Sequence, residues 1–343
     1  MHVTPMTATL QTLTWGRESH GLFDYESRST HEKKLKASGD CKLIRTENEV
    51  EIIKGEELRP EAQVLASFTQ TSSGYFLAPQ EPGSLWLVVK SLQNFVLSEG
   101  AIIKLGRVKY RVKELSGSDT SFPSPFEKVP PEQACKFCFC DENTENNPLI
   151  SPCQCSGSMK FIHLFCLQEW LNSKKLTRNN ENSICHYWKS VDCEICKRPF
   201  PVNVYYKGEP FDLFSVGTKH QPYLILEAVT PERNNHRGIH VITFINKCVA
   251  KLGRGHDSDV RISDISVSRF HATIKYLDGK FILEDNNSKF GTLVQLEESY
   301  DLSTCHDLVE LQIGRTVISV MGKSNLDESL DMSIEETEDE SID

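Results

Sequence analysis

Seven cysteines and one histidine, grouped in four short pairs, constrain this chain more than any other feature of its sequence. The pairs are Cys135/Cys138, Cys153/Cys155, His163/Cys166 and Cys193/Cys196. Thiolate and imidazole are ligands that Zn²⁺ prefers, and a structural zinc site takes four of them in a tetrahedron. Eight ligands therefore predict two zinc ions, each enclosed by protein ligands with no position for a substrate water. Closed sites of this kind build structure, so we predict no catalytic side chain among them.

The order of the pairs predicts how two sites share them. If alternate pairs combine, the first and third pairs form one site, and the second and fourth pairs form the other. Such a cross-brace lets two ions hold together about 70 residues that would bury too small a core alone. One alternative stays open, because Cys140 can replace Cys138, although a loop of two residues suits a single tetrahedral site better.

The composition indicates a soluble globular protein in a reducing compartment. Hydrophobic residues make up 38% of the chain and charged residues 25%, and no apolar run reaches the roughly 18 residues of a membrane helix. The N-terminus lacks the apolar core of a secretory signal, which favours zinc over disulfides and a cytoplasmic or nuclear location. The net charge of -10 comes almost entirely from the acidic residues after Asn325, so it gives no case for nucleic-acid binding.

Polarity and hydrophobic alternation divide the chain into six segments. Short alternating runs indicate strands, and a stretch rich in Ser, Gly and Pro indicates a linker. The polar first segment is expected to be flexible, although a short docking strand stays open as an alternative. The segments are a flexible N-terminus (1–40), a β-rich domain (41–116), a linker (117–132), a zinc module (133–206), a second β-domain (222–322) and a disordered acidic tail (323–343).

A weak internal repeat links the two β-rich segments. Residues 97–110 and 309–318 each contain an apolar strand, a Gly-Arg turn and a second strand. Two strands and a turn also recur by chance, so a shared fold and an accidental likeness are both open.

The residues between the metal ligands resemble one class of cross-brace module. The runs Asn147–Ser158 and His163–Leu171 are similar to the RING-CH (RINGv) finger of MARCH-type ubiquitin ligases. A PHD finger, which reads histone tails, has a shorter step to the histidine and an aromatic residue where this chain has Val191. The resemblance implies a scaffold that binds a ubiquitin-conjugating enzyme charged with ubiquitin. MARCH-type ligases usually span membranes, and this chain departs from them in having no suitable segment.

The resemblance also implies which residues meet the conjugating enzyme. RING folds contact it through a shallow apolar groove. The matching positions in this sequence are Phe137, Trp170, Ile195 and Pro199. Exposed aromatic side chains suit a transient interface, although Trp170 has the alternative of packing only on its own helix. RING ligases also position ubiquitin with a cation beside the last ligand, and Lys197 and Arg198 are the candidates. Glu194 departs from the proline that is common after the seventh ligand.

Three motifs in the C-terminal β-domain resemble those of a forkhead-associated (FHA) domain. They are Gly253-Arg254, the run Ser268–His271, and Gly291-Thr292. FHA domains bind phosphothreonine in loops at one end of a β-sandwich. The phosphate contacts that the resemblance implies come from Arg254, Ser268, Arg269 and Lys289. Guanidinium, hydroxyl and ammonium groups all suit a phosphate.

Other residues of the β-rich segments carry different expectations. His271 is expected to support the loops from inside the sandwich. Phe290 replaces the asparagine that usually contacts the phosphopeptide, which leaves open whether binding is retained. The N-terminal β-rich segment has Gly106-Arg107 without a following Ser-x-x-His motif, so it is expected to be at most a degenerate FHA-like domain without a phosphate site.

Together these features predict a multidomain, mainly β protein. It should combine an FHA-type β-sandwich, a small cross-brace zinc-binding α+β module of the RING-CH type and an N-terminal β-rich domain. The leading hypothesis is a ubiquitin ligase that recruits phosphothreonine proteins through the FHA domain and scaffolds transfer from a conjugating enzyme. The alternative is a non-catalytic zinc-containing adaptor that binds phosphopeptides.

Overall fold

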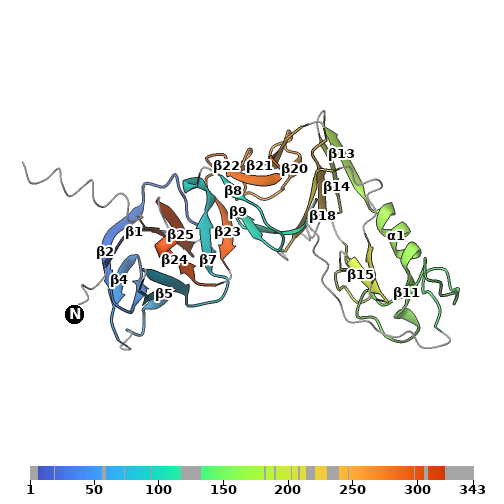
Figure 1. Ribbon diagram of the computed structural model, residues 1–343, viewed down its shortest axis with the longest axis horizontal. Helices are drawn as coiled ribbons and strands as arrows, with labels where there is room; N and C mark the ends of the chain where they lie inside the picture. Colours follow the sequence, from blue (N-terminus) through green and yellow to red (C-terminus); the bar gives the residue numbers. More distant parts are fainter. Residues whose placement is uncertain are drawn as a thin grey trace, which may run out of the picture.

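The structure is a computed structural model that describes residues 7–320, except for 19, 56–58, 73, 93, 117–132, 181–182, 189–190, 202, 208, 214–220, 230–238, 246, 297 and 305–307. The expected linker and acidic tail lie outside the described residues. The described part is mainly β, as predicted, and it contains no helix whose length and hydropathy would allow it to cross a bilayer. Figure 1 shows three bodies in a row: a first β-sandwich near the N-terminus, a second β-sandwich, and a cysteine-rich module around helix α1 (Leu164–Ser173).

The prediction of a flexible segment over residues 1–40 is wrong where strands β1 (Thr7–Trp15) and β2 (Thr30–Ser38) form. The two strands pair along their whole length, and β1 also pairs with β26 (Thr316–Val320). Thr12 and Thr14 of β1 are completely buried. Threonine packs well in a strand but does not count as hydrophobic, so the polar composition concealed the alternation. Strand β2 is the outer strand of its sheet, where its lysines oppose pairing with other chains.

The first sandwich packs two sheets around a common core. The smaller sheet has the order β24-β6-β5-β3-β4. These strands are Tyr300–Asp301, Tyr75–Pro79, Gln63–Gln70, Cys41–Thr46 and Glu49–Ile53. They face one half of a 12-stranded sheet, in the order β7-β25-β26-β1-β2, where β7 is Leu85–Val88 and β25 is Val309–Ile313.

The second sandwich repeats this arrangement. Its smaller sheet has the order β20-β19-β21-β22-β8 and faces β18-β17-β10-β9-β23 of the 12-stranded sheet. The smaller sheet comprises Val260–Arg261, Val249–Gly253, Ala272–Leu277, Lys280–Asp285 and Phe95–Val96. The facing strands are Ile239–Thr243, Tyr223–Ala228, Val108–Leu115, Ile102–Leu105 and Thr292–Leu296. One hydrophobic cluster, from Leu10 to Val320, runs through both sandwiches.

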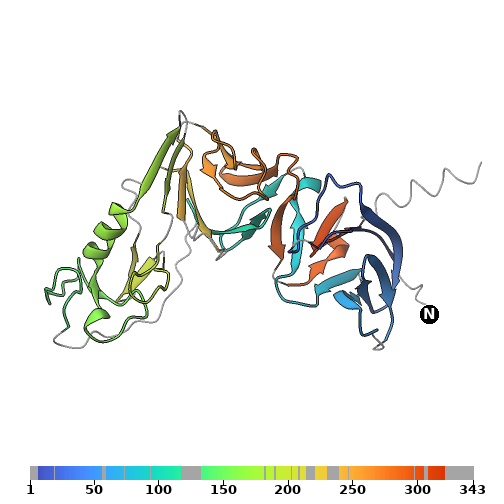
Figure 2. The same ribbon diagram turned by 180° about the vertical axis from the view of Figure 1, so that it is seen from behind.

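Each sandwich contains one hairpin that directly follows, in the sequence, strands of the other sandwich. After β7 the chain enters the second sandwich, where hairpin β9–β10 lies between β17 and β23. After β23 it returns to the first sandwich, where hairpin β25–β26 lies between β7 and β1. The strands β7 and β23 pair antiparallel at the crossing, as Figure 2 shows from behind. The observed pairing thus differs from the expected division into sequential β-domains at 41–116 and 222–322, because the two hairpins of the internal repeat are exchanged.

The Gly-Arg turn of each exchanged hairpin fixes the hairpin to its host sandwich. In the second sandwich, the main-chain N–H of Arg107 donates to Ser266 Oγ at 2.9 Å, and its guanidinium lies 3.3 Å from Asp264. In the first sandwich, the guanidinium of Arg315 donates to the main-chain oxygen of Trp15 at 2.6 Å and to Asn48 Oδ1 at 2.5 Å. Both arginines therefore hold loops of their host sandwich.

The substitution Gly106→Ala is expected to weaken the docking of hairpin β9–β10. Gly106 has a φ of +58°, and a Cβ there would lie 2.4 Å from Ser266 Oγ and 2.6 Å from the Ser266 carbonyl oxygen. The free energy of unfolding should fall by about 2–4 kcal/mol, which urea denaturation measures. Gly100→Ala is the matched control, because Gly100 has a φ of +84° with open space around it. Equal losses in the two variants would show that the contact with Ser266 contributes nothing.

The cysteine-rich module combines helix α1 with short strands. Strands β11 (Leu149–Ile150) and β12 (Ile162–His163) pair, as do β15 (Asn203–Tyr206) and β16 (Glu209–Asp212). Helix α1 buries one of its faces, which carries Leu164, Leu167 and Leu171. The fully buried Trp188 packs in the same core and donates from Nε1 to the main-chain oxygen of Leu171 at 2.8 Å.

A β-hairpin joins this module to the second sandwich. Strand β13 (Leu176–Asn180) pairs with β14 (Ser183–Tyr187), and β14 continues the 12-stranded sheet by pairing with β18. The core of the module extends to Tyr223 and Ile225 of β17 and to Val241 of β18. The module is therefore attached to the sandwich both by main-chain hydrogen bonds and by a shared apolar core.

Candidate functional site

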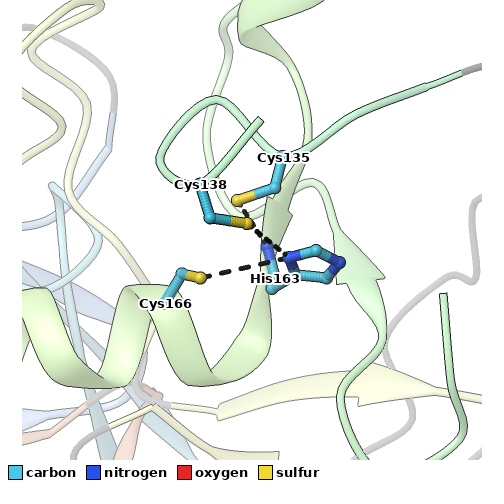
Figure 3. A group of neighbouring side chains, drawn as sticks. All are labelled: Cys135, Cys138, His163 and Cys166. Atoms are coloured by element: carbon cyan, nitrogen blue, oxygen red, sulfur yellow. Dashed lines mark hydrogen bonds between the residues drawn. The ribbon is translucent and has the colours of Figure 1, made fainter. Parts of the chain in front are cut away.

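The first ligand cluster brings together Cys135, Cys138, His163 and Cys166. One side-chain atom from each lies within 4.8 Å of the others, and Figure 3 shows the three sulfurs and the imidazole converging. Cys135 and Cys138 lie in one turn. Within this turn the main-chain N–H of Phe137 donates a hydrogen bond to Cys135 Sγ at 3.4 Å. Cys166 lies in the first turn of α1, where Asn147 Oδ1 accepts the free N–H of Phe165 at 2.9 Å. Cys138, not the alternative Cys140, completes the cluster.

The hydrogen bonds of His163 select the nitrogen that faces the cluster. Its Nε2 lies 2.5 Å from the main-chain oxygen of Glu142, which can only accept, so Nε2 carries the proton. Its Nδ1 lies 3.2 Å from Cys138 Sγ. A ring held through one nitrogen in this way presents the lone pair of the other to a metal.

The second ligand cluster contains Cys153, Cys155, Cys193 and Cys196, again within 4.8 Å of one another. The two clusters thus use alternate pairs along the chain, as the predicted cross-brace requires. Cys155 Sγ and Cys193 Sγ are 3.7 Å apart, close to the separation of about 3.8 Å that follows from tetrahedral Zn–S bonds. The donor sets of three thiolates with one imidazole, and of four thiolates, both fit zinc and leave no open position.

One residue close to the second cluster was missed in the sequence. The side chain of Lys136 is 8% exposed, and its ammonium lies between 3.7 and 3.9 Å from three of the four sulfurs. The position of Lys136 between two ligands of the first cluster indicated that it lies near a metal site. The spacing of the ligands alone did not show that its side chain points to the second cluster.

The residues expected to meet a conjugating enzyme are partly brought together. The ring of Trp170 lies 6.2 Å from the ring of Phe137 and 5.8 Å from that of the buried Phe200. Trp170 is half-buried, while Phe137 is 38% exposed. Trp170 therefore packs against Phe137 and Phe200 and still contributes to the surface of the module. Its contact with a conjugating enzyme stays a prediction.

The loop of the last two ligands carries the remaining predicted residues of this face. Ile195, Lys197, Arg198 and Pro199 are all exposed there. The turn is held by hydrogen bonds from Lys197 N–H to Cys193 O at 2.9 Å and from Cys193 N–H to Arg198 O at 2.8 Å. Glu194 in the same loop pairs with Lys174 Nζ at 2.7 Å. The two candidate cations are thus fixed through the backbone and have free access to solvent at their side chains.

The predicted phosphopeptide residues lie on three loops that meet at Ser268. The main-chain N–H of Arg254 donates to Ser268 O at 2.9 Å, and that of Lys289 donates to Ser268 Oγ at 3.2 Å. Arg269 follows directly, and its carbonyl oxygen accepts the N–H of Gly255 at 2.9 Å. The side chains of Arg254, Arg269 and Lys289 are exposed, so three cationic residues lie on the loops that meet at Ser268.

His271 supports these loops from inside. It is fully buried, and its Nδ1 accepts the main-chain N–H of Ser268 at 3.0 Å. Its Nε2 lies 3.1 Å from the carbonyl oxygen of Gly291. Burial lowers the pKa of His271, which favours the neutral ring with its one proton on Nε2. The histidine thereby ties two of the loops together without being available to a ligand.

The N-terminal segment packs against the third of these loops. Asp24 Oδ2 lies 3.3 Å from Lys289 Nζ, and Tyr25 N–H donates to Lys289 O at 2.9 Å. Phe290 joins a cluster with Trp15, Leu22 and Phe23 from this segment. The phenylalanine that departs from the FHA pattern therefore has a packing role. In the sequence, only the departure from the FHA pattern indicated that Phe290 has a special role. The pattern did not predict the residues that Phe290 packs against.

Comparison with known proteins identifies two domains. Residues 135–196 match the RING-variant domain and residues 250–316 match the FHA domain. The chain is 29% identical over 104 residues to the "ERAD-associated E3 ubiquitin-protein ligase DOA10" of Saccharomyces cerevisiae and 35% identical over 81 residues to the "E3 ubiquitin-protein ligase MARCHF8" of Bos taurus. These matches cover 30% and 24% of this chain, but only 7% and 23% of the two relatives. The chain thus contains a RING-variant and an FHA domain, and it shares with these ligases only a small part of their length.

Proposed function

We propose that this protein is a RING-type ubiquitin ligase that recruits phosphothreonine proteins through its FHA domain. The two interleaved ligand clusters carry the proposal, since they have the donor atoms of the RING-variant domain that the named ligases share. Zinc bound there supplies folding free energy and shape, with no position for a reactant. Ligases of this type hold no ubiquitin themselves, so no nucleophile is required. The reducing cytoplasm or nucleus, where thiolate ligands persist, is the proposed compartment.

The attachment of the RING-variant domain to the second sandwich supports this division of roles. Strand pairing between β14 and β18 fixes the surface around Trp170 relative to the loops around Ser268. A phosphoprotein bound at those loops would be held beside the conjugating enzyme, which raises the effective concentration of its lysines. The first sandwich, whose strand order matches that of the second, is proposed to be an FHA-like fold without a phosphate site.

The ligase proposal predicts that self-ubiquitination depends on both Trp170 and Cys153. The full chain is incubated with activating enzyme, ubiquitin and a panel of conjugating enzymes. Trp170→Ala removes a central aromatic side chain of the proposed groove and should lower the rate about 30-fold or more. Cys153→Ser should abolish the reaction by breaking a ligand cluster. Phe165→Ala, which truncates an exposed aromatic residue on the same helix, is the matched control with an unchanged rate. A silent wild-type protein with two bound zinc ions would instead support the phosphopeptide adaptor.

Phosphopeptide affinity is expected to move in opposite directions in two variants. Arg254→Ala removes a charged phosphate contact and should weaken binding of a phosphothreonine peptide library about 10- to 100-fold. Asp24→Asn releases Lys289 from its ion pair and should strengthen binding about 2- to 5-fold. Fluorescence anisotropy of the full chain measures both, with the unphosphorylated library as control. Equal affinity for the two libraries would refute phosphothreonine recognition and leave the ligase assay unaffected.

A further inference from the structure

A buried lysine faces the cluster of four thiolates. The main chain of Lys136 runs between two ligands of the first cluster, and its N–H donates to Phe161 O at 3.0 Å. The side chain crosses to the second cluster, where Nζ lies 3.7 Å from Cys193 Sγ and 3.9 Å from both Cys153 Sγ and Cys155 Sγ. The ammonium also lies 5.9 Å from the centroid of the Phe137 ring. An ammonium is costly to bury unless charged or polar groups surround it.

The two clusters differ in charge, and Lys136 is at the more negative one. A divalent ion with three thiolates and a neutral imidazole carries a net charge of -1, whereas the same ion with four thiolates carries -2. The second cluster is also well enclosed, with Cys155 and Cys193 both buried. Surplus negative charge is less screened by water there, so a nearby cation has a larger effect on it.

We propose that Lys136 is a positioning residue that stabilises the four-thiolate metal site by donating hydrogen bonds to its sulfurs. The inference rests on metal binding at the two clusters, as proposed above. Because its backbone belongs to the turn of the first site, Lys136 also links the two sites through the chain. Groups around a metal's ligands typically change metal affinity by about 10- to 100-fold when they are removed.

The test compares three variants of the full chain. Lys136→Met keeps most of the apolar stem and removes the charge, whereas Lys136→Arg keeps the charge. Lys207→Met removes one positive charge from an exposed site in the same module, where Lys207 pairs with Glu145, and serves as the matched control. Zinc affinity is measured by chelator competition. Cadmium-113 NMR of the cadmium-loaded chains then reports on each site separately, because the two donor sets give different chemical shifts.

The expected result is selective. In Lys136→Met one of the two sites should lose affinity about 10- to 100-fold, and only the four-thiolate cadmium resonance should shift. Lys136→Arg should restore most of the affinity, and Lys207→Met should match the wild type. Equal weakening of both sites in Lys136→Met, or no weakening, would overturn the proposal. If Lys136→Met loads neither site, Lys136→Gln is measured, and a general loss there too would mean a packing role. Failure of the wild-type chain to bind metal would instead overturn the metal sites themselves.

Discussion

A fragment spanning residues 222–322 is expected to be unfolded on its own. In the full chain, the gap between β17 and β23 is filled by hairpin β9–β10, which lies outside this fragment. The hairpin buries Ile103, Leu105, Tyr110 and Val112 in the common core. Each buried side chain of this size contributes about 1.5–3 kcal/mol, so their loss is comparable with the whole stability of a typical domain, about 5–15 kcal/mol. Circular dichroism and amide proton dispersion in NMR spectra of the fragment measure the outcome.

The control joins the missing hairpin to a shorter fragment that ends before β25, so that hairpin β25–β26 is absent. A fusion of residues 95–116 through a flexible linker to residues 222–304 restores the strand order of the second sandwich and should fold. Folding of the unfused 222–322 fragment as a monomer would contradict the expectation. It would show that hairpin β25–β26 can take the place of β9–β10, as the likeness of the two hairpins permits.

Removal of the metal ions should unfold the cysteine-rich module while most of both sandwiches persists. Structural zinc contributes about 10–16 kcal/mol in isolated zinc-finger peptides, more than the core around α1 is expected to supply alone. The module shares apolar contacts with Tyr223 and Val241, so β18, which pairs with β14, and its neighbour β17 should also lose protection. Hydrogen–deuterium exchange of the full chain with and without a strong chelator locates the change.

Two comparisons make the chelation experiment specific. Cys193→Ser should reproduce the loss of protection in α1 without chelator, whereas Cys248→Ser, at an exposed thiol outside both clusters, should leave the exchange pattern unchanged. Protection of α1 that survives the loss of both ions would show that the apolar core alone holds the module together.

The ligand clusters could be predicted from the sequence because tetrahedral coordination restricts which residues combine. Pairs such as Cys135 and Cys138 are close along the chain, and only a few combinations of four pairs give two sites. The role of His271 was likewise predictable, because its place in the Ser-x-x-His motif constrains its surroundings. In both cases short-range chemistry determined the arrangement.

The exchange of hairpins was not predictable from the same kind of information. Residues 97–110 and 309–318 have the same pattern of apolar strands around a Gly-Arg turn, so the pattern does not tell which hairpin belongs to which sandwich. The pairing of strands that are distant in the sequence decides which hairpin joins which sandwich. Hydrophobic alternation predicts strands but does not predict this pairing. The orientation of Lys136 and the partners of Phe290 were hidden for a related reason, since both depend on segments distant in the chain.

The pairing of Leu10 in β1 with Val320 in β26 also sets the timing of folding during synthesis. At about 5–20 residues per second, a ribosome needs on the order of 15–60 s between making one strand and the other. Until then, the sheet of the first sandwich lacks the two strands that join β1 to β7. Its apolar interior stays incomplete on the ribosome, where such surfaces attract chaperones. A chain terminated before β25 would lack the two strands between β7 and β1. A truncation near the C-terminus would therefore expose the apolar interior of the sandwich that the N-terminal strands begin.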